Sequence, residues 1–175
     1  MNIILVLDDN NYTADMPIVQ KTGARGVILR DGKIAVQKGK AGDCKILGGG
    51  MEGAESAADS LYREVLEEAG LYIIKDKVKE LGTVVERRQD LYQQGVLYCC
   101  NTTYYLCEIE ERTTTPNLTP SELAKGYDII VGDPLYKLIM PKNSSARFIE
   151  RPHRAQSGRL YPPTEKTIAE VIGEV

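Results

Sequence analysis

Residues 49–71 read GGMEGAESAADSLYREVLEEAGL, and this stretch predicts a helix with a defined start and end. Ser56 followed by Asp59 has the spacing of a capping box, in which the serine accepts a backbone N–H and the acid reaches back to the cap. Gly70 can adopt the left-handed conformation that ends a helix, and Leu71 follows it for an apolar contact with the last turn. The sequence therefore predicts a helix between Ser56 and Gly70.

The predicted helix has an apolar side and an acidic side. At about 100° per residue, one arc carries the apolar residues Ala57, Ala58, Leu61, Val65 and Ala69. The opposite arc carries Arg63, Glu64 and Glu67, and Glu68 lies near the boundary. Three carboxylates at this spacing share a face and repel one another unless a cation binds, so the pattern favours a metal site. The alternative is an ordinary solvated face, which is common for helices rich in glutamate.

Three glycines, Gly48 to Gly50, introduce this helix and suit a tight loop whose backbone carbonyls can approach a ligand, since no Cβ blocks the way. From Gly49 to Leu71 the residues follow the order G-x5-E-x7-R-E-V-x-E-E-x-G-L. This order resembles the Nudix box, the signature of hydrolases that act on a nucleoside diphosphate linked to another group. The resemblance covers residues 49–71 of the 175-residue chain.

The resemblance implies a site for Mg²⁺, or alternatively Mn²⁺. Such ions prefer oxygen ligands, neutralise phosphoryl oxygens and lower the pKa of a bound water. The resemblance places metal ligands at Glu67 and Glu68, with Glu64 as a further ligand or as the base that activates water. The backbone carbonyl of Gly48 is expected as an additional ligand. Arg63 is expected to hold the carboxylates in position.

Further acids are candidates for supporting roles. Glu55 is expected to fasten the loop to the helix, with or without a share in metal binding. Glu52 is a candidate for a second metal or for a substrate contact. Members of the family often recruit their catalytic base from outside the box, and Glu122, Glu108 and Glu110 are candidates here. The alternative for these three is that they are ordinary surface acids.

The substrate is only partly constrained by the sequence. The positions after the box that carry a proline in ADP-ribose hydrolases of this family are Glu86 and Arg87 here. Arg87 could contact a phosphate or pair with an acidic neighbour, and Tyr127 could stack on a base or pack within the fold. We expect a small nucleotide substrate, a nucleoside or deoxynucleoside triphosphate cleaved to monophosphate and pyrophosphate. The alternatives are cleavage of an ADP-sugar or another nucleotide-linked compound, and a domain that senses a nucleotide without cutting it.

The composition is that of one ordinary globular enzyme domain, which we expect to span residues 1–175. The net charge of −3, without a block of Lys and Arg, provides no basic field for nucleic acid. No apolar run reaches the length of about 18 residues that spans a membrane, and the apolar start of the chain is too short for a signal peptide. We therefore expect a cytoplasmic protein that binds neither nucleic acid nor membrane, and a homodimer is left open.

The cysteines and the histidine exclude other kinds of site. Cys44, Cys99, Cys100 and Cys107 form neither a CxxC pair nor a zinc pattern, so we expect small buried thiols in a reducing compartment. His153 is the single histidine, which excludes a His-based metal cluster and disfavours a His-dependent nucleophile.

The order of the elements predicts an α/β fold. Strands are expected over residues 3–7, 45–47, 78–87 and 96–108. A hairpin is expected over 23–40, turning at Asp31-Gly32, with a helical turn from Ser121 and helices over 134–140 and 164–172. The basic segment 147–163 is expected to be a phosphate-contacting lid, a dimer contact or a surface loop. Resemblance to Nudix proteins implies an α/β/α sandwich around a mixed β-sheet.

Overall fold

The computed structural model describes residues 2–30, 33–40 and 44–134. The chain divides into two compact units, the first built from Met1–Ile28 and Leu47–Asn117 and the second from Leu29–Ile46 and Leu118–Val175. Strands β2 (Ile18–Arg30) and β4 (Cys44–Gly50) contribute residues to both units.

Several expected features lie outside the described residues. They are the helix at 164–172, the segment 147–163, His153 and the helix expected at 134–140, apart from Pro134 itself. Pro134 is the last residue of strand β7 (Asp128–Pro134).

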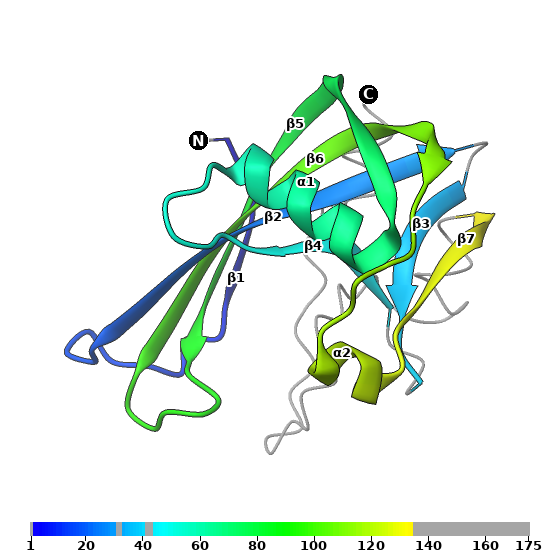
Figure 1. Cartoon of the computed structure of the whole chain (residues 1–175). Helices are drawn as coiled ribbons and strands as arrows, with labels where there is room; N and C mark the ends of the chain where they lie inside the picture. Colours follow the sequence, from blue (N-terminus) through cyan, green and yellow to red (C-terminus); the bar gives the residue numbers. More distant parts are fainter. Residues whose placement is uncertain (1, 31–32, 41–43, 135–175) are drawn as a thin grey trace. The chain divides into compact units, whose positions relative to one another are not determined.

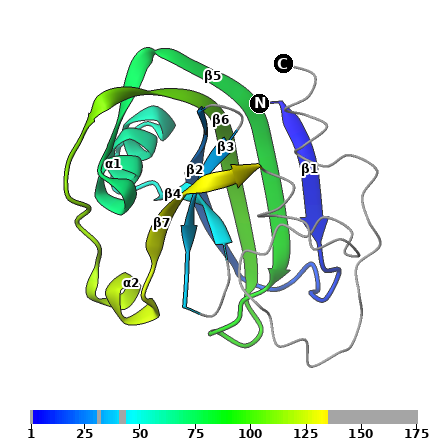
Figure 2. The ribbon, with the colours of Figure 1, turned by 90° about the vertical axis from the view of Figure 1, so that its right-hand side faces the viewer.

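The first unit contains a mixed sheet with the strand order β1-β5-β6-β2-β4 (Figure 1). Strand β1 (Ile3–Asp8) runs parallel to β5 (Leu71–Gln89), and β2 runs parallel to β6 (Leu97–Thr113). The pairs β5–β6 and β2–β4 are antiparallel. Figure 2 shows helix α1 on one face of these strands and β1 beside β5. The prediction of an α/β fold with a mixed sheet is confirmed.

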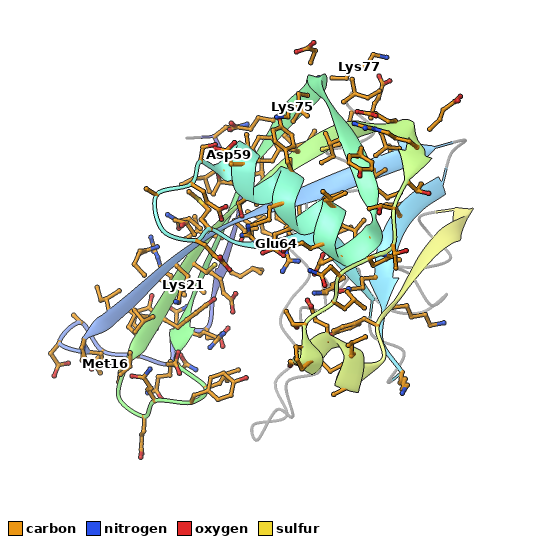
Figure 3. The ribbon with its side chains drawn as sticks, in the orientation of Figure 1. Met16, Lys21, Asp59, Glu64, Lys75 and Lys77 are labelled. Carbon is orange, nitrogen blue, oxygen red and sulfur yellow. The ribbon has the colours of Figure 1, made fainter. Side chains whose placement is uncertain are left out.

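Strands β5 and β6 are longer than the sequence predicted. Strand β5 begins directly after Gly70, where Leu71 and Ile73 are buried and pair with the far end of β6. The exposed residues Lys75 to Lys77 follow at a shift in register (Figure 3). These charges interrupt the apolar pattern, so this first part of the strand could not be identified from the sequence.

Helix α1 (Ala57–Ala69) has the caps that the sequence predicted. The Ser56 hydroxyl accepts the Asp59 N–H at 3.1 Å, and the Asp59 carboxylate accepts the Ser56 N–H at 3.3 Å. Leu61 and Val65 are fully buried, and a Cβ on Gly26 of β2 would lie only 3.1 Å from Leu61 Cδ1. The helix can therefore pack closely on β2 because Gly26 has no side chain.

The second unit is a smaller antiparallel arrangement around β3 (Lys33–Lys38). Strand β3 pairs with the end of β2, with the start of β4 and with β7. The pairs Leu29 with Ile34 and Arg30 with Lys33 confirm the predicted pairing of the two strands. The expected turn at Asp31-Gly32 lies outside the described residues. Helix α2 (Pro120–Lys125) follows an N-cap at Thr119 and confirms the expected helical turn.

Cys107 is buried as the sequence predicted, whereas Cys99 and Cys100 are less buried than predicted. Cys107 is 2% exposed, and burial raises its pKa to about 12. Cys99 and Cys100 are free thiols that are only partly buried.

The end of α1 provides a test of the fold. Gly70 has φ 65°, and a Cβ there would lie 1.8 Å from the Thr114 carbonyl oxygen, whereas Gly95 has φ 74° with nothing within 4 Å of a Cβ. Replacing either glycine by alanine costs about 1–2 kcal/mol for the left-handed backbone, and only Gly70→Ala adds a collision. We expect urea unfolding to show a loss for Gly70→Ala that exceeds the loss for Gly95→Ala by about 2 kcal/mol or more. Equal losses would contradict the observed packing of this helix end.

Candidate functional site

The guanidinium of Arg63 lies at the centre of the acidic face of α1. Its Nε and Nη2 donate to the two carboxylate oxygens of Glu55 at 3.2 and 2.8 Å. Its Nη1 donates to Glu64 Oε1 at 2.8 Å and to Glu67 Oε2 at 3.2 Å. Its Nη2 also donates to the Gly50 carbonyl at 3.1 Å. One cation therefore connects the loop before the helix, the helix itself and the end of β4.

The Glu64 carboxylate occupies the space that a side chain on Gly49 would need. Figure 3 labels Glu64 on helix α1. A Cβ on Gly49 would lie 2.3 Å from Glu64 Cδ, so a larger residue here would displace the carboxylate. Burial raises the pKa of Glu64, against the opposing effect of the Arg63 contact. A carboxylate with a raised pKa accepts a proton more readily, which suits a group that activates water.

Glu68 and Gly48 form the inner part of the site. The sequence placed Glu68 at the boundary of the two arcs, but the residue is only 3% exposed. Its Oε2 accepts the backbone N–H of Gly48 at 2.8 Å. The Gly48 carbonyl accepts a hydrogen bond from Nη1 of Arg25 on β2. All of these groups belong to the first unit.

Arg25 is the residue at this site that the sequence analysis missed. The available signal was a charged residue within a strand of the predicted hairpin, between Ala24 and Gly26. That signal was weak, because the contact between Arg25 and Gly48 depends on the pairing of β2 with β4.

Glu55 connects the loop to the helix, as its contacts show. One carboxylate oxygen also accepts the Glu52 N–H at 2.6 Å. The hydrogen bonds from Arg63 lower the pKa of Glu55 to about 2. Glu52 itself is exposed and contributes this contact through its backbone.

Glu122 and Tyr127 lie in the second unit. Glu122 Oε2 accepts both the N–H and the hydroxyl of Thr119 at 2.8 Å, and Oε1 lies 3.8 Å from Lys45 Nζ. Burial acts to raise the pKa of Glu122, but the hydrogen bonds from Thr119 outweigh it and the pKa is lowered. The ammonium of Lys45 lies 4.9 Å from the centre of the Tyr127 ring. The catalytic role of Glu122 and the substrate contact of Tyr127 stay predictions.

The other candidate residues have ionic partners. Glu108 pairs with Lys77 at 2.6 Å on the exposed surface, and Glu110 pairs with Arg112. Arg87 Nη1 lies 3.9 Å from Asp8 Oδ2. This contact agrees with the alternative that Arg87 pairs with an acidic neighbour.

The donor groups of the site fit a hard divalent ion. Among residues 2–30, 33–40 and 44–134, no three His, Cys, Asp or Glu side chains are already arranged as metal ligands. Glu64 and Glu67 nevertheless accept from the same nitrogen atom, so their oxygens lie within two hydrogen-bond lengths of each other. Carboxylate and backbone carbonyl oxygens are the ligands that Mg²⁺ prefers. The site contains four carboxylates and two guanidiniums, so its net charge is −2 when all of them are ionised. These residues are Glu55, Glu64, Glu67, Glu68, Arg25 and Arg63.

Acid should weaken the folded state through Glu55. In the unfolded chain its pKa is near 4.5, but in the folded protein it is about 2. Between these values the unfolded state binds the extra proton, so lowering the pH favours unfolding. We expect urea unfolding of wild type to show a loss of stability from pH 4.5 toward 2 that is reduced in Glu55→Gln. Glu80→Gln, which changes an exposed acid of the same unit, should keep the wild-type slope. An unchanged slope in Glu55→Gln would contradict the Arg63 contact.

One protein family and several solved structures are similar to this chain. The family model of the NUDIX domain matches residues 20–126. A MutT NUDIX hydrolase from Burkholderia pseudomallei is similar in structure, with 24% identity, a TM-score of 0.43, and coverage of 57% of this chain and 77% of that chain. A NUDIX hydrolase from Nitrosomonas europaea has 19% identity and a TM-score of 0.43, over 58% of this chain and 67% of that chain. No curated protein matches the sequence.

In the described part of the chain, no helix is long and apolar enough to cross a membrane.

Proposed function

This chain belongs to the NUDIX family of hydrolases, whose model matches residues 20–126, and we propose that it cleaves a nucleoside or deoxynucleoside triphosphate to monophosphate and pyrophosphate with a divalent ion. Hydrolysis of a nucleoside diphosphate linked to another group is the general activity of the family. The observation that carries the proposal is the set of carboxylates gathered around Arg63 beside the glycine backbone of β4.

We propose that Glu64, Glu67, Glu68 and the Gly48 carbonyl hold Mg²⁺, or alternatively Mn²⁺. When bound, the ion neutralises phosphoryl oxygens and lowers the pKa of a bound water. Glu64 supplies the proton-accepting group, since its burial against Gly49 raises its pKa. Its contact with Arg63 fixes the position of the carboxylate before an ion binds.

Arg63 acts as a positioning residue in this proposal. Its contact with Glu55 is bidentate, whereas Glu64 and Glu67 share a single nitrogen. Glu64 and Glu67 can therefore turn toward a metal ion while Arg63 keeps Glu55 and the Gly50 carbonyl. The loop and the helix stay connected during this change.

We also propose roles for four further residues. Glu122 can act as a base after its carboxylate leaves the Thr119 cap. Arg87 and Tyr127 are proposed as substrate contacts, and Glu52 as a contact to substrate or to a second metal. We also propose that residues 1–175 form one domain, because the family match runs through residues of both units.

A panel of nucleotides tests the reaction. With Mg²⁺, we expect at least one nucleoside triphosphate to give the monophosphate and pyrophosphate, separated by chromatography. A chelator should abolish this turnover and excess Mg²⁺ should restore it, since the carboxylates need the ion to bind phosphates. Preferred cleavage of an ADP-sugar to AMP and a sugar phosphate would support the second candidate substrate instead. Nucleotide binding without any product would indicate a sensing domain and contradict the proposed catalysis.

Substitution of the acids tests the proposed ligands. Glu64→Gln, Glu67→Gln and Glu68→Gln should each lower kcat/KM, because a neutral amide binds a divalent ion poorly. The loss should be about 100-fold or more, beyond the 10–100-fold typical of residues that only support a ligand. Glu80→Gln should keep wild-type activity, since Glu80 is an exposed acid on β5. Full activity in both Glu67→Gln and Glu68→Gln would remove the assignment, provided that circular dichroism shows all variants folded.

A further inference from the structure

Both backbone polar groups of Gly48 form hydrogen bonds with charged side chains. Glu68 reaches its N–H from α1 at 2.8 Å, and Arg25 of β2 donates to its carbonyl.

Gly48 pairs with Arg25 in the β2–β4 ladder and has a backbone conformation that glycine adopts readily. Its φ is +127°, a conformation that side chains rarely allow, and a Cβ would lie 2.2 Å from the Ala24 carbonyl oxygen. Glycine has the largest conformational freedom of any residue, and Gly49 and Gly50 follow directly. The carbonyl is therefore oriented by its neighbours, of which Arg25 makes the direct contact.

We infer that Arg25 is a positioning residue that aims the Gly48 carbonyl at the divalent ion, an inference that rests on the proposed function. A carbonyl oxygen has two lone pairs, so it can accept from Arg25 and bind an ion at the same time. The guanidinium is planar with donors in fixed directions, which a lysine ammonium on a flexible stem cannot reproduce. The half-buried position of Arg25 restrains the group further.

Charge alone predicts the opposite effect for this residue. A guanidinium close to a divalent cation repels it, so removing Arg25 would strengthen metal binding if charge dominated. If positioning dominates, removing Arg25 weakens metal binding although a positive charge is lost. The sign of the change in metal affinity therefore distinguishes the two effects.

The test is a Mn²⁺ titration of the full-length chain without nucleotide, with free Mn²⁺ measured by electron paramagnetic resonance. Arg25→Met should weaken Mn²⁺ binding about 10–100-fold, the range found for residues that orient metal ligands. Arg25→Lys should also weaken it, because the charge remains but the fork geometry is lost. Lys21→Met is the matched control, because this substitution also removes one positive charge from β2. Lys21 is an exposed residue four positions before Arg25 (Figure 3). The Mn²⁺ affinity of Lys21→Met should equal that of wild type.

Turnover provides a second measurement. At limiting Mg²⁺ the Arg25 variants should lose kcat, and raising Mg²⁺ should restore most of it. If Arg25 only stabilised the fold, its substitution would lower the thermal unfolding midpoint measured in the presence of a chelator. At temperatures below that midpoint, the Mn²⁺ affinity would stay unchanged. If Arg25→Met does not fold, Arg25→Lys decides the question.

Unchanged or tighter Mn²⁺ binding in a folded Arg25 variant would overturn the inference. Equal weakening in Lys21→Met would also overturn it, because the loss of affinity would then not depend on the contact between Arg25 and Gly48. If wild type neither binds Mn²⁺ nor cleaves a nucleotide, the proposed function fails. If wild type does both and the Arg25 variants keep its affinity, only the role of Arg25 fails.

Discussion

The contact between the Arg63 guanidinium and the surrounding carboxylates is the constraint on which the site depends. Glu55, Glu64 and Glu67 carry like charges, and they can remain close because one planar cation donates to all of them. Since Arg63 also donates to the Gly50 carbonyl, the same group ties β4 to α1. The arrangement therefore couples the position of the acids to the position of the sheet.

The glycines of β4 make the second half of this arrangement. Gly49 leaves the space that the Glu64 carboxylate occupies, and Gly48 adopts a backbone conformation unsuited to other residues. The Gly50 carbonyl accepts from Ser60 at 3.1 Å as well as from Arg63. Side chains of α1 and β2 can thus reach the backbone groups of β4 because β4 carries no side chains there. The freedom of these backbone groups is then removed by contacts from α1 and β2.

The pKa values of two glutamates of this site are shifted in opposite directions. Hydrogen bonds from Arg63 hold the pKa of Glu55 near 2, so Glu55 stays ionised and anchors the guanidinium. Burial raises the pKa of Glu64 although the same guanidinium contacts it. Environments that separate the pKa values of neighbouring acids assign them different roles, and here they suit Glu55 as an anchor and Glu64 as a proton acceptor.

The sequence by itself determined α1, its caps at Ser56 and Gly70, and the gathering of the acids on one face, because these depend on residues three or four positions apart. The early start of β5, the burial of Glu68 and the contact of Arg25 with Gly48 were decided by the tertiary structure. Each requires strands far apart in the chain to pair in one register, or α1 to pack on them. Local spacing carries no information on such pairings, whereas it is sufficient for a helix and the side chains on its surface.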